Sequence, residues 1–175
     1  MSDLTQTTAV PAARAPFRPG IATLLLSFAM FTAGASGLVS EYVLATVSTY
    51  ILGNSIEQFS VVIGLMLFMM GVAAWVQRFT SDRWLVDRFL LLEILLALAG
   101  GVAPMAIYAA SAVMPHHFAL VQYGFVMAIG FLIGFEIPVV LRINETYSER
   151  LKANVGRVLA ADYIGSLAGA LLARR

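Results

Sequence analysis

Long apolar runs dominate the chain, in place of the alternating apolar and polar positions that mark a soluble helix or strand. A helix rises about 1.5 Å per residue, so about 20 apolar residues cross a bilayer core of about 30 Å. Four runs without Lys or Arg are long enough, and we expect full spans at 21–43, 58–77, 90–113 and 118–141. The pattern therefore predicts an all-α fold, a polytopic transmembrane helical bundle.

The two ends of the chain depart from this pattern. Residues 1–20 are rich in Ala, Thr and Pro and lack apolar periodicity, which predicts a mobile cytoplasmic tail ahead of a helical domain at 21–175. A signal peptide with its cleavage site at 33–35 is the rival interpretation, although apolar sequence continues well beyond that site. The last apolar run is short, so we expect a truncated fifth helix at 158–173, as in a fragment or a split gene product.

Cationic residues collect in alternate connections between the expected spans. The turns at 53–57 and 114–117 carry no Lys or Arg. Because short loops rich in Lys and Arg stay on the cytoplasmic side, we expect a multi-pass protein of the cell inner (plasma) membrane with its N terminus in the cytoplasm. Nine of the eleven cationic residues lie on that side: Arg14, Arg18, Arg78, Arg83, Arg88, Arg142, Arg150, Lys152 and Arg157.

The composition agrees with a membrane protein and excludes several kinds of chemistry. The chain is 60% hydrophobic and 12% charged, with a mean hydropathy of +0.86; soluble domains are about 45 to 50% apolar and about 25% charged. A net charge of +1 argues against a nucleic-acid partner, and the absence of cysteine excludes disulfides and thiolate sites. Glycine-rich nucleotide loops and hydrolase motifs are missing, and the pair His116 and His117 has no further ligands nearby. We expect no catalytic residue and no metal site in this chain.

Small residues at helical spacing predict where membrane helices approach each other closely. One interpretation is packing inside a single bundle, and the other is packing between copies of the chain in a homo-oligomer. Pro104 and Pro138 predict kinks in the third and fourth spans. The packing candidates are Gly34 and Gly37 in the first span, Gly64 and Gly71 in the second, and Gly130 and Gly134 in the fourth.

Three carboxyl groups inside the apolar sequence are the main candidates for chemistry, because ionisable residues in a bilayer are costly. Glu93, Glu136 and Asp162 each lie five or six residues from an arginine at the cytoplasmic end of a helix. That places them about 7 to 9 Å inside the boundary, in one acidic layer. Glu41 is expected nearer the opposite face. The layer either fastens helices together as protonated or paired carboxyls, or it binds a cation or exchanges protons from the cytoplasm.

Four segments have distinctive sequences: GASGLVSEY at 34–42, YILGNS at 50–55, GFEIP at 134–138 and GRVLAADYIG at 156–165. In this order they resemble the N-terminal membrane region of the transmembrane spermidine synthase-like proteins. In that family, several membrane helices precede a soluble aminopropyltransferase domain of Rossmann type. The membrane-region motif residues that match are Glu41, Glu136, Pro138 and Asp162.

The resemblance implies transfer of an aminopropyl group from decarboxylated S-adenosylmethionine to putrescine. The family's catalytic half has no counterpart in these 175 residues, so no catalytic residue carries over, and decarboxylated S-adenosylmethionine is expected as a co-substrate only with a downstream or separate catalytic domain. We expect a membrane domain that is inactive alone and has the lipid bilayer and an aminopropyltransferase domain as partners. The alternative is a stand-alone transport or scaffold protein in which Glu93, Glu136 and Asp162 bind a cation or a polyamine.

Overall fold

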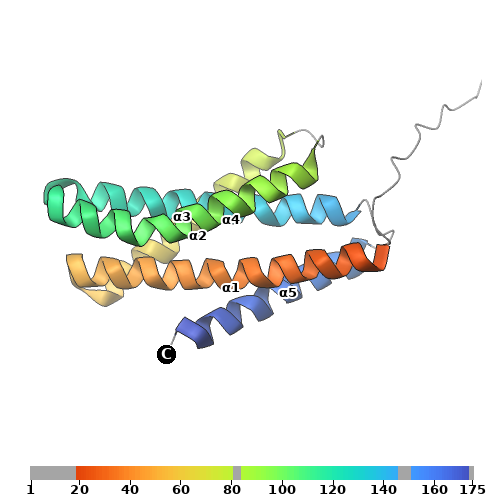
Figure 1. Cartoon of the computed structure of the whole chain (residues 1–175), viewed down its shortest axis with the longest axis horizontal. Coiled ribbons are helices and arrows are strands. Elements are labelled where there is room, and N and C mark those ends of the chain that lie inside the picture. Colours follow the sequence, from red (N-terminus) through yellow and green to blue (C-terminus); the bar gives the residue numbers. More distant parts are fainter. Residues whose placement is uncertain (1–18, 81–83, 146–150, 174–175) are drawn as a thin grey trace, which may run out of the picture.

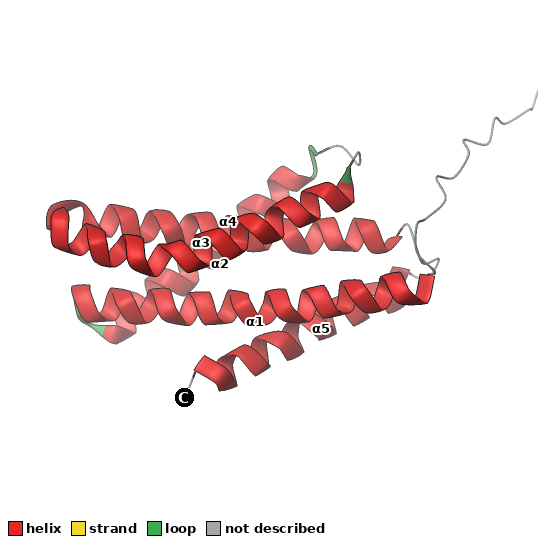
Figure 2. Cartoon of the chain, viewed as in Figure 1, coloured by secondary structure: helices red, strands yellow, loops and turns green. Residues whose placement is uncertain are grey.

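The computed structural model describes residues 19–80, 84–145 and 151–173. Within these ranges the chain is helical and contains no strand, which confirms the all-α fold (Figure 2). The expected tail at 1–20 lies almost entirely outside the described residues. The helices are α1 (Pro19–Leu52), α2 (Ser55–Gln77), α3 (Leu85–Val113), α4 (Phe118–Glu145) and α5 (Leu151–Ala173), with a short 3-10 helix, η1 (Pro115–His117), before α4.

All five α-helices are long and apolar enough to cross a membrane. Each of the four full spans expected from sequence lies within one of the helices α1 to α4. The fifth helix is longer than expected: α5 has 23 residues, and its portion Val155–Ala173 is long enough to span. The difference lies at the start of the helix: the polar and cationic positions at 151–157, expected to be part of a loop, form the first turns of α5. Pro104 and Pro138 both lie within continuous helices, α3 and α4.

Successive helices run in opposite directions in an elongated bundle (Figure 1). Helix α5 packs along α1, while α4 packs against both α2 and α3. Within the described ranges, α2 and α5 do not contact each other. The antiparallel order brings the starts of α1, α3 and α5 and the ends of α2 and α4 to the same end of the bundle (Figure 1). The helix ends that border the cationic loops therefore share one side.

The turn between α1 and α2 depends on two residues that tolerate left-handed backbone conformations. Gly53 has a φ of 76° and Asn54 a φ of 46°. Gly lacks the Cβ that opposes positive φ, and Asn adopts this region more readily than most residues. The Asn54 side chain accepts a hydrogen bond from the backbone N–H of Glu57 at 3.5 Å and donates one to its carboxylate at 2.9 Å. The same short segment thus ends α1 and caps α2.

The interior contains two apolar clusters, one toward each end of the bundle. The cluster near the α1–α2 turn joins α1 to α4 through residues such as Leu44, Val62 and Ile129. The cluster near the opposite end includes Met30 and Val139. Most of the remaining apolar side chains face outward, as expected for helices whose solvent is lipid. Three exposed aromatic residues lie near helix ends, where interfacial aromatic belts occur: Trp75 in the last turn of α2, Trp84 directly before α3, and Tyr108 five residues before the end of α3.

Polar side chains link the helices inside the first of these clusters. The buried Gln122 of α4 donates from its Nε2 to the carbonyl oxygen of Leu44 at 2.9 Å and to the hydroxyl of Ser48. The Tyr123 hydroxyl donates to the side-chain oxygen of Gln58 on α2 at 2.9 Å. Hydrogen bonds of this kind between membrane helices contribute about 0.6 kcal/mol each on average. They connect α4 to α1 and to α2 near the α1–α2 turn.

Candidate functional site

Two glycines of α4 bring its backbone against that of α2. A Cβ built on Gly130 would stand 2.9 Å from the Cα of Met66, and one built on Gly134 would overlap the backbone of Met70. No larger residue fits at either position without moving a helix. The structure therefore places this pair, which the sequence analysis named, at a backbone-to-backbone contact of the kind that small-xxx-small spacing predicts.

A second close contact joins α1 to α5. A Cβ on Gly34 would overlap the carbonyl oxygen of Asp162, and Cβ atoms on Gly165 and Gly169 would overlap or crowd carbonyl oxygens of α1. The Ser166 hydroxyl also donates to the carbonyl oxygen of Gly34 at 3.2 Å. Gly34 was predicted from the sequence as a packing residue, whereas the two glycines of α5 were not. Their four-residue spacing on one helix face was the signal that could have found them.

The other glycines named from sequence have different surroundings. A Cβ on Gly37 would meet the Cδ1 atom of Ile133 at 3.3 Å, so α1 approaches α4 closely here. Gly64 and Gly71 are exposed, and no described atom lies within 4 Å of the Cβ positions built on them. Neither of these two packs against another helix among the described residues. Contact between copies of the chain remains the alternative for that face of α2.

Carboxyl groups from three helices meet inside the bundle. The side chain of Glu93 on α3 is hydrogen-bonded to that of Glu136 on α4, and Asp162 on α5 is close enough for its charge to act on Glu136. Glu136 is only 3% exposed, and its Oε1 atom has no hydrogen-bond partner among the described residues. A buried polar atom in this condition costs about 1 to 3 kcal/mol.

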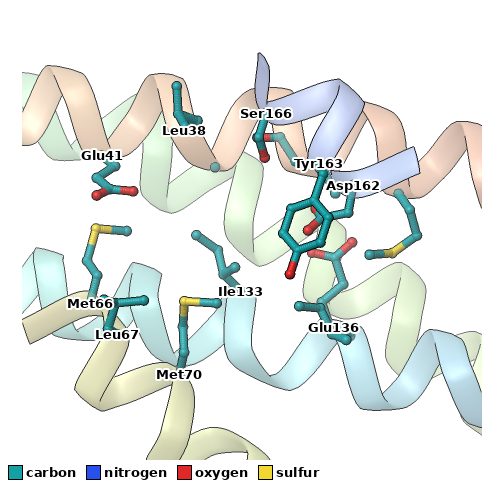
Figure 3. Close-up of a pocket in the computed structure, with 15 residues that line it drawn as sticks. Leu38, Glu41, Met66, Leu67, Met70, Ile133, Glu136, Asp162, Tyr163 and Ser166 are labelled. Atoms are coloured by element: carbon teal, nitrogen blue, oxygen red, sulfur yellow. The ribbon is translucent and has the colours of Figure 1, made fainter. Parts of the chain in front are cut away.

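A cavity of about 200 Å³ lies beside Glu136. Residues of α1, α2, α4 and α5 line it, at the place where α2 and α5 do not meet. In Figure 3 the carboxyl groups of Glu136 and Asp162 lie close together toward one side, and Glu41 lies at the other beside Met66, with Ile133 and Met70 between the two sides. The cavity thus has acidic groups at two ends and apolar side chains between them.

Glu41 belongs to this cavity, although the sequence analysis placed it outside the acidic layer. It lies seven residues after Gly34, which is two helical turns or about 10 Å along α1. Glu41 is therefore displaced along the membrane normal, as expected, but it lines the same cavity as Glu136 and Asp162. Distance from a boundary does not reveal which face of a helix a residue occupies. The shared face of Gly34, Gly37 and Glu41 was the signal in the sequence.

Glu93 does not line this cavity. It lines a second cavity of about 250 Å³ between α1 and α3, together with Ser36, Ser40 and Gly100. Its connection to the first cavity is the hydrogen bond to Glu136. The structure therefore brings together the three carboxyls that were predicted from the sequence, but they line different cavities. Glu136 and Asp162 line the first cavity, and Glu93 lines the second.

The chemistry of the cavity wall differs from that of a metal centre. Among the residues that the structure describes, no group of three or more His, Asp or Glu side chains is arranged to hold a metal ion. His116 and His117 are exposed in η1, far along the chain from the carboxyls. The first cavity instead offers carboxyl oxygens beside thioether and aliphatic side chains. Such a wall suits a positively charged organic group.

The fold and this cavity define a polytopic helical membrane domain with an acidic internal cavity. Nearly the whole chain is also similar in sequence to proteins named polyamine aminopropyltransferase. It is 41% identical over 164 residues to polyamine aminopropyltransferase 1 of Ralstonia nicotianae, covering 94% of this chain and 31% of that protein. It is 41% identical over 148 residues to polyamine aminopropyltransferase 2 of Aquifex aeolicus, covering 84% and 29%. The corresponding protein of Leptospira interrogans is 37% identical over 136 residues, covering 78% and 27%.

The chain spans about 30% of the length of these relatives. Over that region it is a homologue of the polyamine aminopropyltransferases, which confirms the family resemblance identified from the sequence. No family model matches the chain, and no solved structure matches it.

Proposed function

We propose that this chain is the membrane domain of a polyamine aminopropyltransferase. In this proposal a catalytic domain of Rossmann type, joined to the chain or separate from it, transfers the aminopropyl group of decarboxylated S-adenosylmethionine to putrescine. The observation that carries the proposal is the 41% identity to the Ralstonia nicotianae relative over 94% of this chain. The five apolar helices support it, because they provide a membrane anchor and leave the nucleotide-binding sheet to another part of the protein.

We expect the purified 175-residue chain to catalyse no aminopropyl transfer, because its described residues contain no strand from which a nucleotide-binding sheet could form. The assay measures spermidine formed from putrescine and decarboxylated S-adenosylmethionine. A chimera in which this chain replaces the matching 31% of the Ralstonia nicotianae relative should be active in the membrane fraction. Turnover by the isolated chain, or a membrane-inserted chimera without activity where the unaltered relative is active, would contradict the proposal.

We further infer that the N terminus lies in the cytoplasm and that the membrane is the cell inner membrane. The distribution of cationic residues supports this orientation, because cytoplasmic loops retain Lys and Arg. The chain has no native cysteine, so single cysteines report without background. Cysteine at Asn54 or His116 should react with an impermeant thiol reagent added to intact cells, whereas Arg83→Cys should react only after permeabilisation. The opposite labelling pattern would invert the topology.

A further inference from the structure

The first cavity separates its acidic groups by a fixed interval along α1. Asp162 lies against Gly34, and Glu41 follows Gly34 by two helical turns, so the positions on α1 that mark the two acidic ends are about 10 Å apart along the helix axis. A hydrogen bond from an ammonium group to a carboxylate is about 2.8 Å long. Subtracting one such bond at each end leaves about 5 Å, which an aliphatic chain of about three or four carbons bridges.

The buried carboxyl of Glu136 provides independent evidence for a ligand at one end of the cavity. Its Oε1 atom has no hydrogen-bond partner among the described residues, although only 3% of the residue is exposed. Figure 3 shows this carboxyl directed toward Asp162 and the cavity. An ammonium group carries three N–H donors and no acceptor, so it can donate to Glu136 and Asp162 at once.

The middle of the cavity matches the chain that would connect two ammonium groups. Ile133 and Met70 line it between the acidic ends, and Met66 lies beside Glu41 (Figure 3). Methionine side chains are flexible and polarizable, and they adapt to an aliphatic chain without offering it a hydrogen bond. Leu67 and Tyr163, which also line the cavity, are largely exposed on α2 and α5. The cavity is therefore open sideways, between the two helices that do not touch.

We propose that this cavity binds a linear aliphatic diammonium ion. One ammonium group lies between Glu136 and Asp162, the other lies at Glu41, and the methylene chain lies against the two methionines of α2. Glu93 acts as a positioning residue, because its hydrogen bond holds the Glu136 carboxyl in place. The site rests on the geometry of the cavity, whereas naming its ligand as a polyamine rests on the proposed function.

Isothermal titration of the 175-residue chain in lipid nanodiscs tests this proposal with three probes: putrescine, 1,3-diaminopropane and the monoamine n-butylamine. We expect at least one diamine to bind about tenfold or more tightly than n-butylamine, since only a diamine reaches both acidic ends. Glu41→Gln should reduce diamine binding to the level of the monoamine and leave the monoamine unaffected. Glu136→Gln should weaken both by about tenfold or more, because the amide keeps hydrogen-bonding capacity but loses the charge.

Glu57→Gln is the matched control, because Glu57 is an exposed carboxyl in the first turn of α2, and the diamine binding of this variant should equal that of the parent chain. Thermal unfolding shows whether each variant is folded, and Asp162→Asn replaces Glu136→Gln in the comparison if the latter unfolds. Failure of the folded parent chain to prefer a diamine overturns the proposal. Diamine binding that survives both Glu41→Gln and the substitution at the other end overturns it as well.

The same measurements separate this proposal from the proposed function. An active chimera together with a chain that binds no diamine would eliminate the site and retain the membrane domain of an aminopropyltransferase. Diamine binding that requires Glu41 and Glu136, together with an inactive chimera, would retain the site and eliminate that function. Tight binding of Mg²⁺ in place of the diamine would show an inorganic cation site and would also overturn the proposal.

Discussion

Replacing Gly165 by leucine should separate α5 from α1 and lower the free energy of unfolding by about 3 kcal/mol. A Cβ at this position would overlap the carbonyl oxygen of Phe31. That oxygen belongs to the backbone of a 34-residue helix, so it cannot rotate away as a side chain would. The free energy of unfolding can be measured by denaturation in mixed micelles, with the distance between α1 and α5 followed by labels on introduced cysteines.

Gly156→Leu provides the control on the same helix. Gly156 is exposed, and no described atom lies within 4 Å of a Cβ built on it. The substitution should leave the distance between α1 and α5 unchanged and should not reduce stability, because leucine favours a helix over glycine by several tenths of a kcal/mol. An equal loss in the two variants would show that the effect comes from leucine on α5 in general and would refute the close contact.

Replacing Gly134 by leucine should produce a loss of similar size, about 3 kcal/mol, at the contact between α4 and α2. A Cβ there would overlap the Cα of Met70 and crowd its carbonyl oxygen. Separating these helices would also displace Met70 and Glu136, which both line the first cavity. We therefore expect the variant to lose ligand binding along with stability, as measured by denaturation and by titration with diamines.

Gly71→Leu is the comparison for this variant, because the sequence marks both glycines as packing residues. Gly71 is exposed on α2, with no described atom within 4 Å of its built Cβ. The monomeric chain should tolerate leucine there with little change in stability. A loss comparable to that of Gly134→Leu, accompanied by a fall in the mass of the detergent-solubilised particle, would instead assign this face of α2 to contact between copies.

The helices themselves could be predicted because a membrane span has a simple physical requirement. A bilayer core of fixed thickness demands about 20 apolar residues, whatever the helix packs against. The length of α5 was the exception, since its first residues, 151–157, include Lys152 and Arg157 and resemble a cationic loop when only hydropathy is considered. In the structure they begin α5, and Asp162 further along the helix lies against Gly34 and beside Glu136 inside the bundle.

The meeting of Glu93, Glu136 and Asp162 was also predictable, because a rise of about 1.5 Å per residue converts distance from a boundary arginine into depth. Depth could not show that Glu93 lies behind Glu136 or that Glu41 shares the cavity. Those facts depend on the rotation of each helix about its own axis. Several rotations give the same depths but present different faces to the neighbouring helices.

Length, apolar runs and cationic loops thus determine the helical class and the order of the helices and predict the depth of each carboxyl, since these depend only on the chain and the bilayer. The packing of the helices against one another establishes the cavity. Backbone contacts at Gly34, Gly134 and Gly165 set the rotation and spacing of α1, α4 and α5, and these contacts join residues far apart in the chain. The space left between α2 and α5 is a consequence of all the contacts together, so no single segment encodes it.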